Sequence, residues 1–167
     1  MISNIYWIDD EEIGEKQIGI MARPRGNDWL EDEIKWLKIR EVDYLISLLE
    51  KSEEWELGLD RESEICEEKG VNFISFPIKD VNIPKNEIEF IQLAKKMSIE
   101  IKEKKKVVIH CRMGIGRSSI LAAAIMINLG INGKGIFEKI GKFRKLEVPD
   151  TDEQKKWILS IKDKLKI

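Results

Sequence analysis

A glycine-rich stretch in the second half of the chain, HCRMGIGRSS at residues 110–119, contains the residues best suited to chemistry. It holds the only histidine, His110, and one of the two cysteines, Cys111. Two glycines lie between this cysteine and Arg117. A cysteine becomes a strong nucleophile only as the thiolate, so its surroundings decide what it can do.

The sequences on both sides of this stretch predict the elements that hold it. Val107-Val108-Ile109 is β-branched and predicts a short strand, and residues 117–129 predict a buried helix that Gly130 ends. Between a strand and a helix, the N–H groups of a loop can converge, and the helix N-terminus adds partial positive charge. Gly114 and Gly116 allow the tight turn that this requires. The pattern therefore predicts an anion-binding loop.

We call residues 111–117 the cysteine loop. A free thiol has a pKa of about 8.5, and helix N-termini and nearby cations lower such values. The guanidinium of Arg117 offers a planar fork that matches two phosphate oxygens. We expect this setting to favour the thiolate of Cys111 and to direct it at a bound phosphorus. The chemistry predicted is phosphoryl transfer through a cysteinyl-phosphate.

The spacing CX5R, here CRMGIGR followed by Ser118, resembles the signature of the protein tyrosine phosphatase superfamily, and its compact dual-specificity-like branch most of all. The resemblance covers about residues 18–154. It implies an α/β fold whose central sheet is mixed, mostly parallel and flanked by helices. It also implies a metal-independent hydrolase for phosphotyrosine, with phosphoserine and phosphothreonine left open. No cofactor is expected, and the ligand would be a phosphorylated protein, a small phosphate ester or another oxyanion.

The resemblance assigns roles within the loop. Ser118 would hydrogen-bond the departing thiolate and ease hydrolysis, although a helix-capping role is compatible with this. His110 would bond the loop backbone and help to hold Cys111 as the thiolate, without touching substrate. The residues expected to bind the phosphate are Arg112, Met113, Gly114, Ile115, Gly116 and Arg117.

A departing ester oxygen needs a proton, so the site requires a positioned acid. The segment FPIKDVNIP offers Asp80 on a loop after a predicted strand, 31 residues before Cys111. We call residues 79–84 the acid loop. The resemblance supports Asp80 as general acid and then as base for water. The alternative is a turn aspartate that bonds nearby N–H groups.

The segment VPDTDEQ, residues 148–154, resembles a family segment whose glutamine helps to position water. This would make Gln154 a supporting residue. The alternative is a helix start that Asp150 or Thr151 caps.

Three further residues have open roles. Arg23 and Arg25 precede a predicted helix. In related chains this region flanks the catalytic pocket, so the two arginines either face the substrate or have a structural role. Cys66 lies on a predicted helix, from which it could pair with Cys111 under oxidation.

Strand and helix patterns alternate over the rest of the chain, which favours an α/β fold. Asp28 is the expected N-cap of its helix, Gly70 ends another, and Pro84 opens a third whose apolar face includes Ile88. The predicted strands are residues 5–8, 18–21, 42–49 and 71–76; the predicted helices are residues 28–38, 60–69, 136–143 and two that begin at residue 84 and near residue 150 or 151.

Composition limits the functional classes. The 167 residues suit one domain, residues 1–167, and a net charge of −2 gives no basic excess for nucleic acid. The longest apolar stretch, residues 120–131, is too short to cross a membrane, and the N-terminus lacks the pattern of a signal peptide. We therefore expect a cytoplasmic protein. One histidine and two cysteines cannot fill a zinc site without carboxylates, so no metal is expected.

Two alternative functions remain open. One is a pseudophosphatase that binds a phosphate or a phosphoprotein but turns it over weakly. The other is a phosphatase for an ester that is not a protein. Met113 and Ile115 are apolar where phosphatases of lipid and inositol phosphates often carry lysine, which weakens the case for polyphosphorylated substrates.

Overall fold

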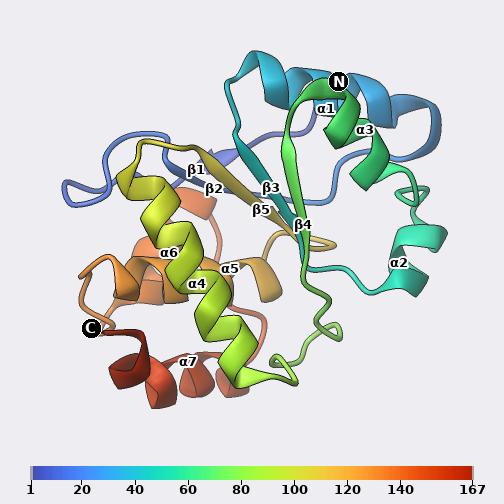
Figure 1. The fold of residues 1–167 in the computed structure, drawn as a ribbon. Helices are drawn as coiled ribbons and strands as arrows, with labels where there is room; N and C mark the ends of the chain where they lie inside the picture. Colours follow the sequence, from blue (N-terminus) through green and yellow to red (C-terminus); the bar gives the residue numbers. More distant parts are fainter. Residues whose placement is uncertain (1, 167) are drawn as a thin grey trace.

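The computed structural model of the protein describes residues 2–166, which form five strands and seven α-helices (Figure 1). The strands are β1 (Tyr6–Trp7), β2 (Ile18–Met21), β3 (Tyr44–Ser47), β4 (Asn72–Ser75) and β5 (Val107–His110). The helices are α1 (Leu30–Ile39), α2 (Lys51–Glu56), α3 (Glu62–Lys69), α4 (Glu87–Lys102), α5 (Arg117–Asn128), α6 (Ile136–Arg144) and α7 (Asp152–Leu165).

The strands form one sheet in the order β1-β2-β5-β3-β4. β1 pairs antiparallel with β2, whereas the pairs β2–β5, β5–β3 and β3–β4 are parallel. The sheet is therefore mixed and mostly parallel, as predicted. β5 lies at its centre and all four of its residues are buried, so the cysteine loop begins at a fixed point.

Helices cover both faces of the sheet. α1 and α3 lie on one face, and α4, α5, α6 and α7 lie on the other (Figure 1). Successive strand residues point to opposite faces, so Val108 joins the core under α1 and α3, while Ile109 joins the core under α5. Every residue from Arg117 to Ile127 in α5 is buried, which explains why residues 120–127 of this helix are apolar on all sides.

The structure corrects several predicted boundaries. Asp28 does not cap α1, because it lies inside a 3-10 turn over Asn27–Trp29. Pro84 does not open α4; the Asn86 side chain caps that helix by accepting the Glu89 N–H. Ile88 is 69% exposed and lies off the apolar face.

Other boundaries agree more closely with the sequence. Gly70 adopts the left-handed conformation at the end of α3, as its position predicted. The short helix α2 had no sequence signal, because KSEEWE has almost no apolar face. Within residues 2–166, no helix is long and apolar enough to span a lipid bilayer.

Candidate active site

The cysteine loop follows the C-terminal end of β5 and leads directly into α5. Cys111 is only 3% exposed. The Ser118 hydroxyl donates a hydrogen bond to the Cys111 sulfur over 3.0 Å. Ser118 is the second residue of α5, so the first turn of the helix holds a donor against the sulfur. This contact stabilises negative charge on the sulfur.

The carbonyl groups in the middle of the loop are held by Arg144, at the end of α6. Its Nε donates to the Gly114 carbonyl over 2.8 Å, and its Nη2 donates to the Met113 carbonyl over 3.0 Å. The guanidinium also lies 4.2 Å from the ring centroid of Tyr6. Arg144 therefore fixes which way two consecutive peptide groups face.

The first two carbonyls of the loop also have close neighbours. The Arg23 N–H donates to the Arg112 carbonyl over 3.2 Å, and the Nδ1 of His110 lies 3.3 Å from the Cys111 carbonyl. In a trans peptide the N–H points away from the preceding carbonyl. Each N–H group at positions 112–115 therefore points away from the preceding carbonyl, and within residues 2–166 none of these N–H groups donates to an acceptor. These N–H groups are therefore available as donors to an anion, and we call them the cradle.

Two glycines allow this compact path. Gly114 has φ +68°, and a Cβ there would lie 2.7 Å from the carbonyl carbon of Met21. A Cβ on Gly116 would overlap Oδ2 of Asp150 and lie 2.8 Å from its Cγ. A side chain at either position would collide with backbone or with a carboxyl group.

Arg117 is 1% exposed and is held by a glutamate that the sequence analysis missed. Its two terminal nitrogens donate to the carboxylate oxygens of Glu53 in α2, over 2.7 and 2.9 Å. Nη1 also donates to the Ile78 carbonyl over 2.9 Å. Burial alone would lower the pKa of Arg117, but Glu53, Cys111 and Asp80 raise it above its ordinary value. The guanidinium is fixed in position and charged.

Arg117 also connects the cysteine loop to the acid loop. Its Nη2 lies 3.1 Å from Oδ1 of Asp80. Its Nε–H donates to no acceptor among the described residues, so this donor is free to bond a phosphate oxygen. The structure thus brings together four residues that the sequence singled out: Cys111, Ser118, Arg117 and Asp80.

Glu53 also lies next to the second arginine of the loop. Nε of Arg112 lies 3.6 Å from Oε1 of Glu53, and its Nη2 donates to Glu56 over 2.8 Å. Burial would raise the pKa of Glu53, but the Arg117 hydrogen bond, the Glu50 N–H and the charges of both arginines outweigh it, and the pKa lies below its ordinary value. α2 thus presents a carboxylate to each arginine of the loop.

His110 faces the other side of the sheet, toward α3. Its Nε2 lies 2.6 Å from Oε1 of Glu62, and both side chains are at most 1% exposed. Because Nδ1 lies next to the Cys111 carbonyl, both ring nitrogens face acceptor atoms. Glu62 therefore fixes the ring, and through it the end of β5.

Asp80 lies in an acid loop with a strained backbone. Its side chain is 54% exposed, and its Oδ1 accepts the Val81 N–H over 3.0 Å. Val81 has φ +53°, which is rare for a β-branched residue, and the Asn82 side chain donates to the Asp80 carbonyl over 2.8 Å. Asp80 is therefore accessible to solvent, and Arg117 and its own turn hold it in place.

Gln154 is fully buried and joins the acid loop to the start of α7. Its Nε2 donates to the Asn82 carbonyl over 3.1 Å, and its Oε1 accepts the Thr151 N–H over 3.2 Å. The Thr151 hydroxyl in turn accepts the Gln154 N–H, which completes a capping box. The capping interpretation fits this geometry with Thr151 as the cap. The water-positioning role stays a prediction.

Arg25 does not face the cysteine loop. It pairs with Glu33 over 2.6 Å and lies over the Trp29 ring at 4.6 Å. Arg23 contributes its backbone N–H to the loop, while its side chain donates to the Pro24 carbonyl.

Cys66 is buried among α1 and α3, whereas Cys111 belongs to the core on the opposite face of the sheet. This separation argues against a disulfide between them. Burial and the charge of Glu62 raise the pKa of the Cys66 thiol, so it is an unreactive core residue.

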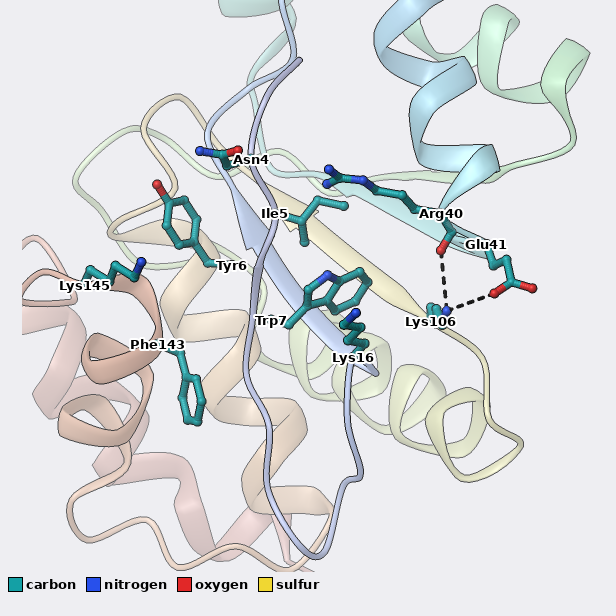
Figure 2. Close-up of a pocket in the computed structure, with 10 residues that line it drawn as sticks. All are labelled: Asn4, Ile5, Tyr6, Trp7, Lys16, Arg40, Glu41, Lys106, Phe143 and Lys145. Carbon is teal, nitrogen blue, oxygen red and sulfur yellow. Dashed lines mark hydrogen bonds and ion pairs between the residues drawn. The ribbon is translucent and has the colours of Figure 1, made fainter. Parts of the chain in front are cut away.

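The cavities of the surface do not by themselves identify this site. The cavity in Figure 2, of about 740 Å³, runs along β1 and is lined by no residue of the cysteine loop. Its cations are Lys16, Arg40, Lys106 and Lys145, and Lys106 is already paired with Glu41. A second cavity, of about 420 Å³, does reach the cysteine loop at Ile115.

The fold and this site agree with what the chain resembles. Residues 19–131, more than half of the chain, match the family described as "Polymorphic toxin system, DSP-PTPase phosphatase". A viral protein named as a tyrosine phosphatase, 197R of Invertebrate iridescent virus 6, is 39% identical over 57 residues. These residues make up 32% of this chain and 21% of the viral protein, so the match spans about a fifth of that relative.

Solved structures share the fold at low sequence identity. Kinase-associated phosphatase, with its catalytic-site cysteine replaced by serine, aligns with a TM-score of 0.89 at 18% identity, over 99% of this chain and 97% of that one. The active form of Tk-PTP aligns with a TM-score of 0.75 at 22% identity, over 95% and 96%. TpbA of P. aeruginosa in complex with phosphotyrosine aligns with a TM-score of 0.62 at 14% identity, over 90% and 83%. With its family match, its fold and its CX5R loop, the chain belongs to the polymorphic-toxin-system family of DSP-PTPase phosphatases, within the cysteine-dependent protein tyrosine phosphatase superfamily.

Proposed function

We propose that the protein hydrolyses phosphotyrosine monoesters through a cysteinyl-phosphate on Cys111. The observation that carries this proposal is the cysteine loop itself. A buried sulfur lies at the start of a loop whose carbonyls contact other groups and whose N–H groups at positions 112–115 make no hydrogen bond within residues 2–166. Such donors are placed to stabilise the charge on the transferring phosphoryl group.

In the first step the Cys111 thiolate attacks phosphorus while the ester oxygen departs with its electron pair. The loop N–H groups and the free Nε–H of Arg117 bind the phosphoryl oxygens. Asp80 gives a proton to the departing oxygen, for which its exposed position beside Arg117 suits it. In the second step Asp80 takes a proton from water as the water attacks phosphorus. Ser118 stabilises the thiolate that leaves, through the hydrogen bond it already makes to the sulfur.

An aryl phosphate on a protein is the substrate class that the rim favours. Met113 is 60% exposed and Ile115 is half-buried, so the loop offers apolar side chains to the leaving group. No residue between Cys111 and Arg117 is a lysine, and the one cation there, Arg112, is already paired with Glu56, which gives a polyphosphorylated lipid headgroup little extra positive charge. The complex of TpbA with phosphotyrosine supports the same class by structural similarity.

The first test is the hydrolysis of an aryl phosphate by the wild-type protein and by Cys111→Ser, each with and without EDTA. We expect turnover by the wild type in EDTA and none by the variant. Turnover by Cys111→Ser in EDTA would refute the cysteinyl-phosphate mechanism. If the wild type binds phosphate or vanadate tightly but does not hydrolyse the aryl phosphate, the result would instead favour a pseudophosphatase.

The second test concerns Asp80. We expect Asp80→Asn to slow the hydrolysis of esters with poor leaving groups more than that of esters with good ones, because only the former need a proton in the transition state. A rate loss that is the same for all leaving groups would remove Asp80 from the acid role.

A further inference from the structure

A second carboxyl group lies against the cysteine loop. Asp150 comes just before α7. Its carboxyl group is in contact with Gly116 and occupies the space that a Cβ on this residue would take. Gly116 precedes Arg117, so this carboxyl group lies beside the cradle. The residue as a whole is exposed, which leaves the group accessible to a substrate in the loop.

The positions of the two carboxylates are coupled through buried Gln154. Its side chain bonds the Asn82 carbonyl in the acid loop and the Thr151 N–H next to Asp150. One buried side chain therefore joins the acid loop to the segment that contains Asp150.

The two carboxyl groups differ in their partners. Asp80 lies 3.1 Å from Nη2 of Arg117, and its Oδ1 accepts the Val81 N–H over 3.0 Å. Asp150 makes no hydrogen bond or salt bridge through its side chain to any residue from 2 to 166. Its partial burial and the negative charge of Asp80 raise the pKa of Asp150, and Arg117 only partly opposes this. A raised pKa and the lack of a protein partner among the described residues suit Asp150 to carry a proton.

Helix capping does not explain Asp150. The cap of α7 is Thr151, whose hydroxyl accepts the Gln154 N–H over 3.1 Å. The carboxyl group of Asp150 thus takes no part in the capping box.

We propose that Asp150 is a second general acid of this site, sharing proton transfer with Asp80. This inference rests on the proposed function and adds a group to it. As the Cys111 sulfur bonds to phosphorus, the phosphorus–oxygen bond of the ester breaks and its electron pair goes to the leaving oxygen. The Asp150 proton moves to that oxygen, which gives a neutral phenol and an Asp150 carboxylate. When water then attacks phosphorus, its proton returns to a carboxylate and the thiolate leaves.

The experiment compares kcat/KM for phenyl phosphate and 4-nitrophenyl phosphate, because only phenol is a poor leaving group. This parameter reports the step that phosphorylates the cysteine and is independent of the later hydrolysis. The variants are Asp80→Asn, Asp150→Asn and the double variant. Asp152→Asn is the matched control, since Asp152 is an exposed carboxylate two residues along the chain.

We expect Asp150→Asn to lower kcat/KM for phenyl phosphate about 100-fold, within the usual range for a general acid, and to lower it less than tenfold for 4-nitrophenyl phosphate. The double variant should lose more on phenyl phosphate than either single variant. Asp152→Asn should match the wild type, and inhibition of Asp150→Asn by orthovanadate should stay within about twofold if the cradle is intact. Asp150→Glu, which keeps an acid, should recover part of the loss on phenyl phosphate.

An equal effect of Asp150→Asn on both esters, or no effect on either, would overturn the proposal while leaving the phosphatase function in place. So would an Asp150→Glu variant that is folded and binds vanadate but is as slow on phenyl phosphate as Asp150→Asn. A wild-type protein that hydrolyses neither ester would overturn the proposed function, and the role of Asp150 with it.

Discussion

Glu53 should control both the stability of the protein and the position of Arg117. Its carboxylate accepts two charged hydrogen bonds, at 2.7 and 2.9 Å, from a guanidinium that is 1% exposed. Hydrogen bonds to charged groups contribute about 1.5–3 kcal/mol each. Glu53→Gln keeps the size and one acceptor but removes the charge. We therefore expect a loss of about 2–3 kcal/mol in the free energy of unfolding, somewhat below the cost of removing one partner of a buried pair altogether.

The same substitution should weaken phosphoryl transfer. Without the carboxylate, Arg117 keeps the Ile78 carbonyl and Asp80 as neighbours but loses the pair of bonds that fixes the plane of its guanidinium. Loss of one fixed donor to a transition-state oxygen costs about 100-fold to 1,000-fold. Because Arg117 itself remains, we expect kcat/KM to fall by about 10-fold to 100-fold.

The assays are urea unfolding and kcat/KM with an aryl phosphate, and Glu56→Gln is the control. Glu56 is in the same helix, and its side chain is 66% exposed where it pairs with Arg112, so its loss should cost less than about 1 kcal/mol. If Glu53→Gln and Glu56→Gln have the same stability and activity, the reasoning from the buried pair is wrong.

Three further outcomes follow from the same geometry. Ser118→Ala should leave the first step nearly unchanged and slow the release of phosphate from Cys111, seen as a burst of phenol followed by a slower steady state; a burst-free variant with wild-type turnover would contradict this. Arg144→Met should weaken inhibition by vanadate about tenfold, because two loop carbonyls lose their donor, and unchanged inhibition would contradict it. The pKa of Glu53 is lowered by folding, so its stabilising effect is present above its ordinary value of 4.5 and is lost as the pH falls through the lowered pKa. The stability difference between the wild type and Glu53→Gln should therefore shrink below pH 4.5. A difference that grows as the pH falls would show that folding does not lower the pKa of Glu53.

The sequence was most informative where chemistry depends on a short continuous segment. The strand, the cysteine loop and the helix after it are consecutive in the chain, and glycine and arginine at fixed spacing suffice to indicate an anion cradle. The alternation of strands and helices also predicted the α/β fold, and the family resemblance implied its mixed, mostly parallel sheet.

Element boundaries were less predictable, because local signals compete with packing. Asp28 is a good capping residue by type, but the chain turns there as a 3-10 helix. Pro84 suits a first helical turn, but the acid loop continues to Asn86, which caps α4 with its side chain.

The sequence by itself was enough to predict a nucleophile candidate, an anion-binding loop and a class of ligand, because those residues are neighbours in the chain. The partners that fix them were decided only by the tertiary structure. Glu53, Glu62 and Arg144 lie 64, 48 and about 30 residues from their partners, in segments that resemble ordinary charged surface. A charged side chain carries no local sign that it will be buried against another charge. The contribution of each of these three side chains depends on which helices the sheet brings to the carboxyl end of β5, and that is a property of the whole fold.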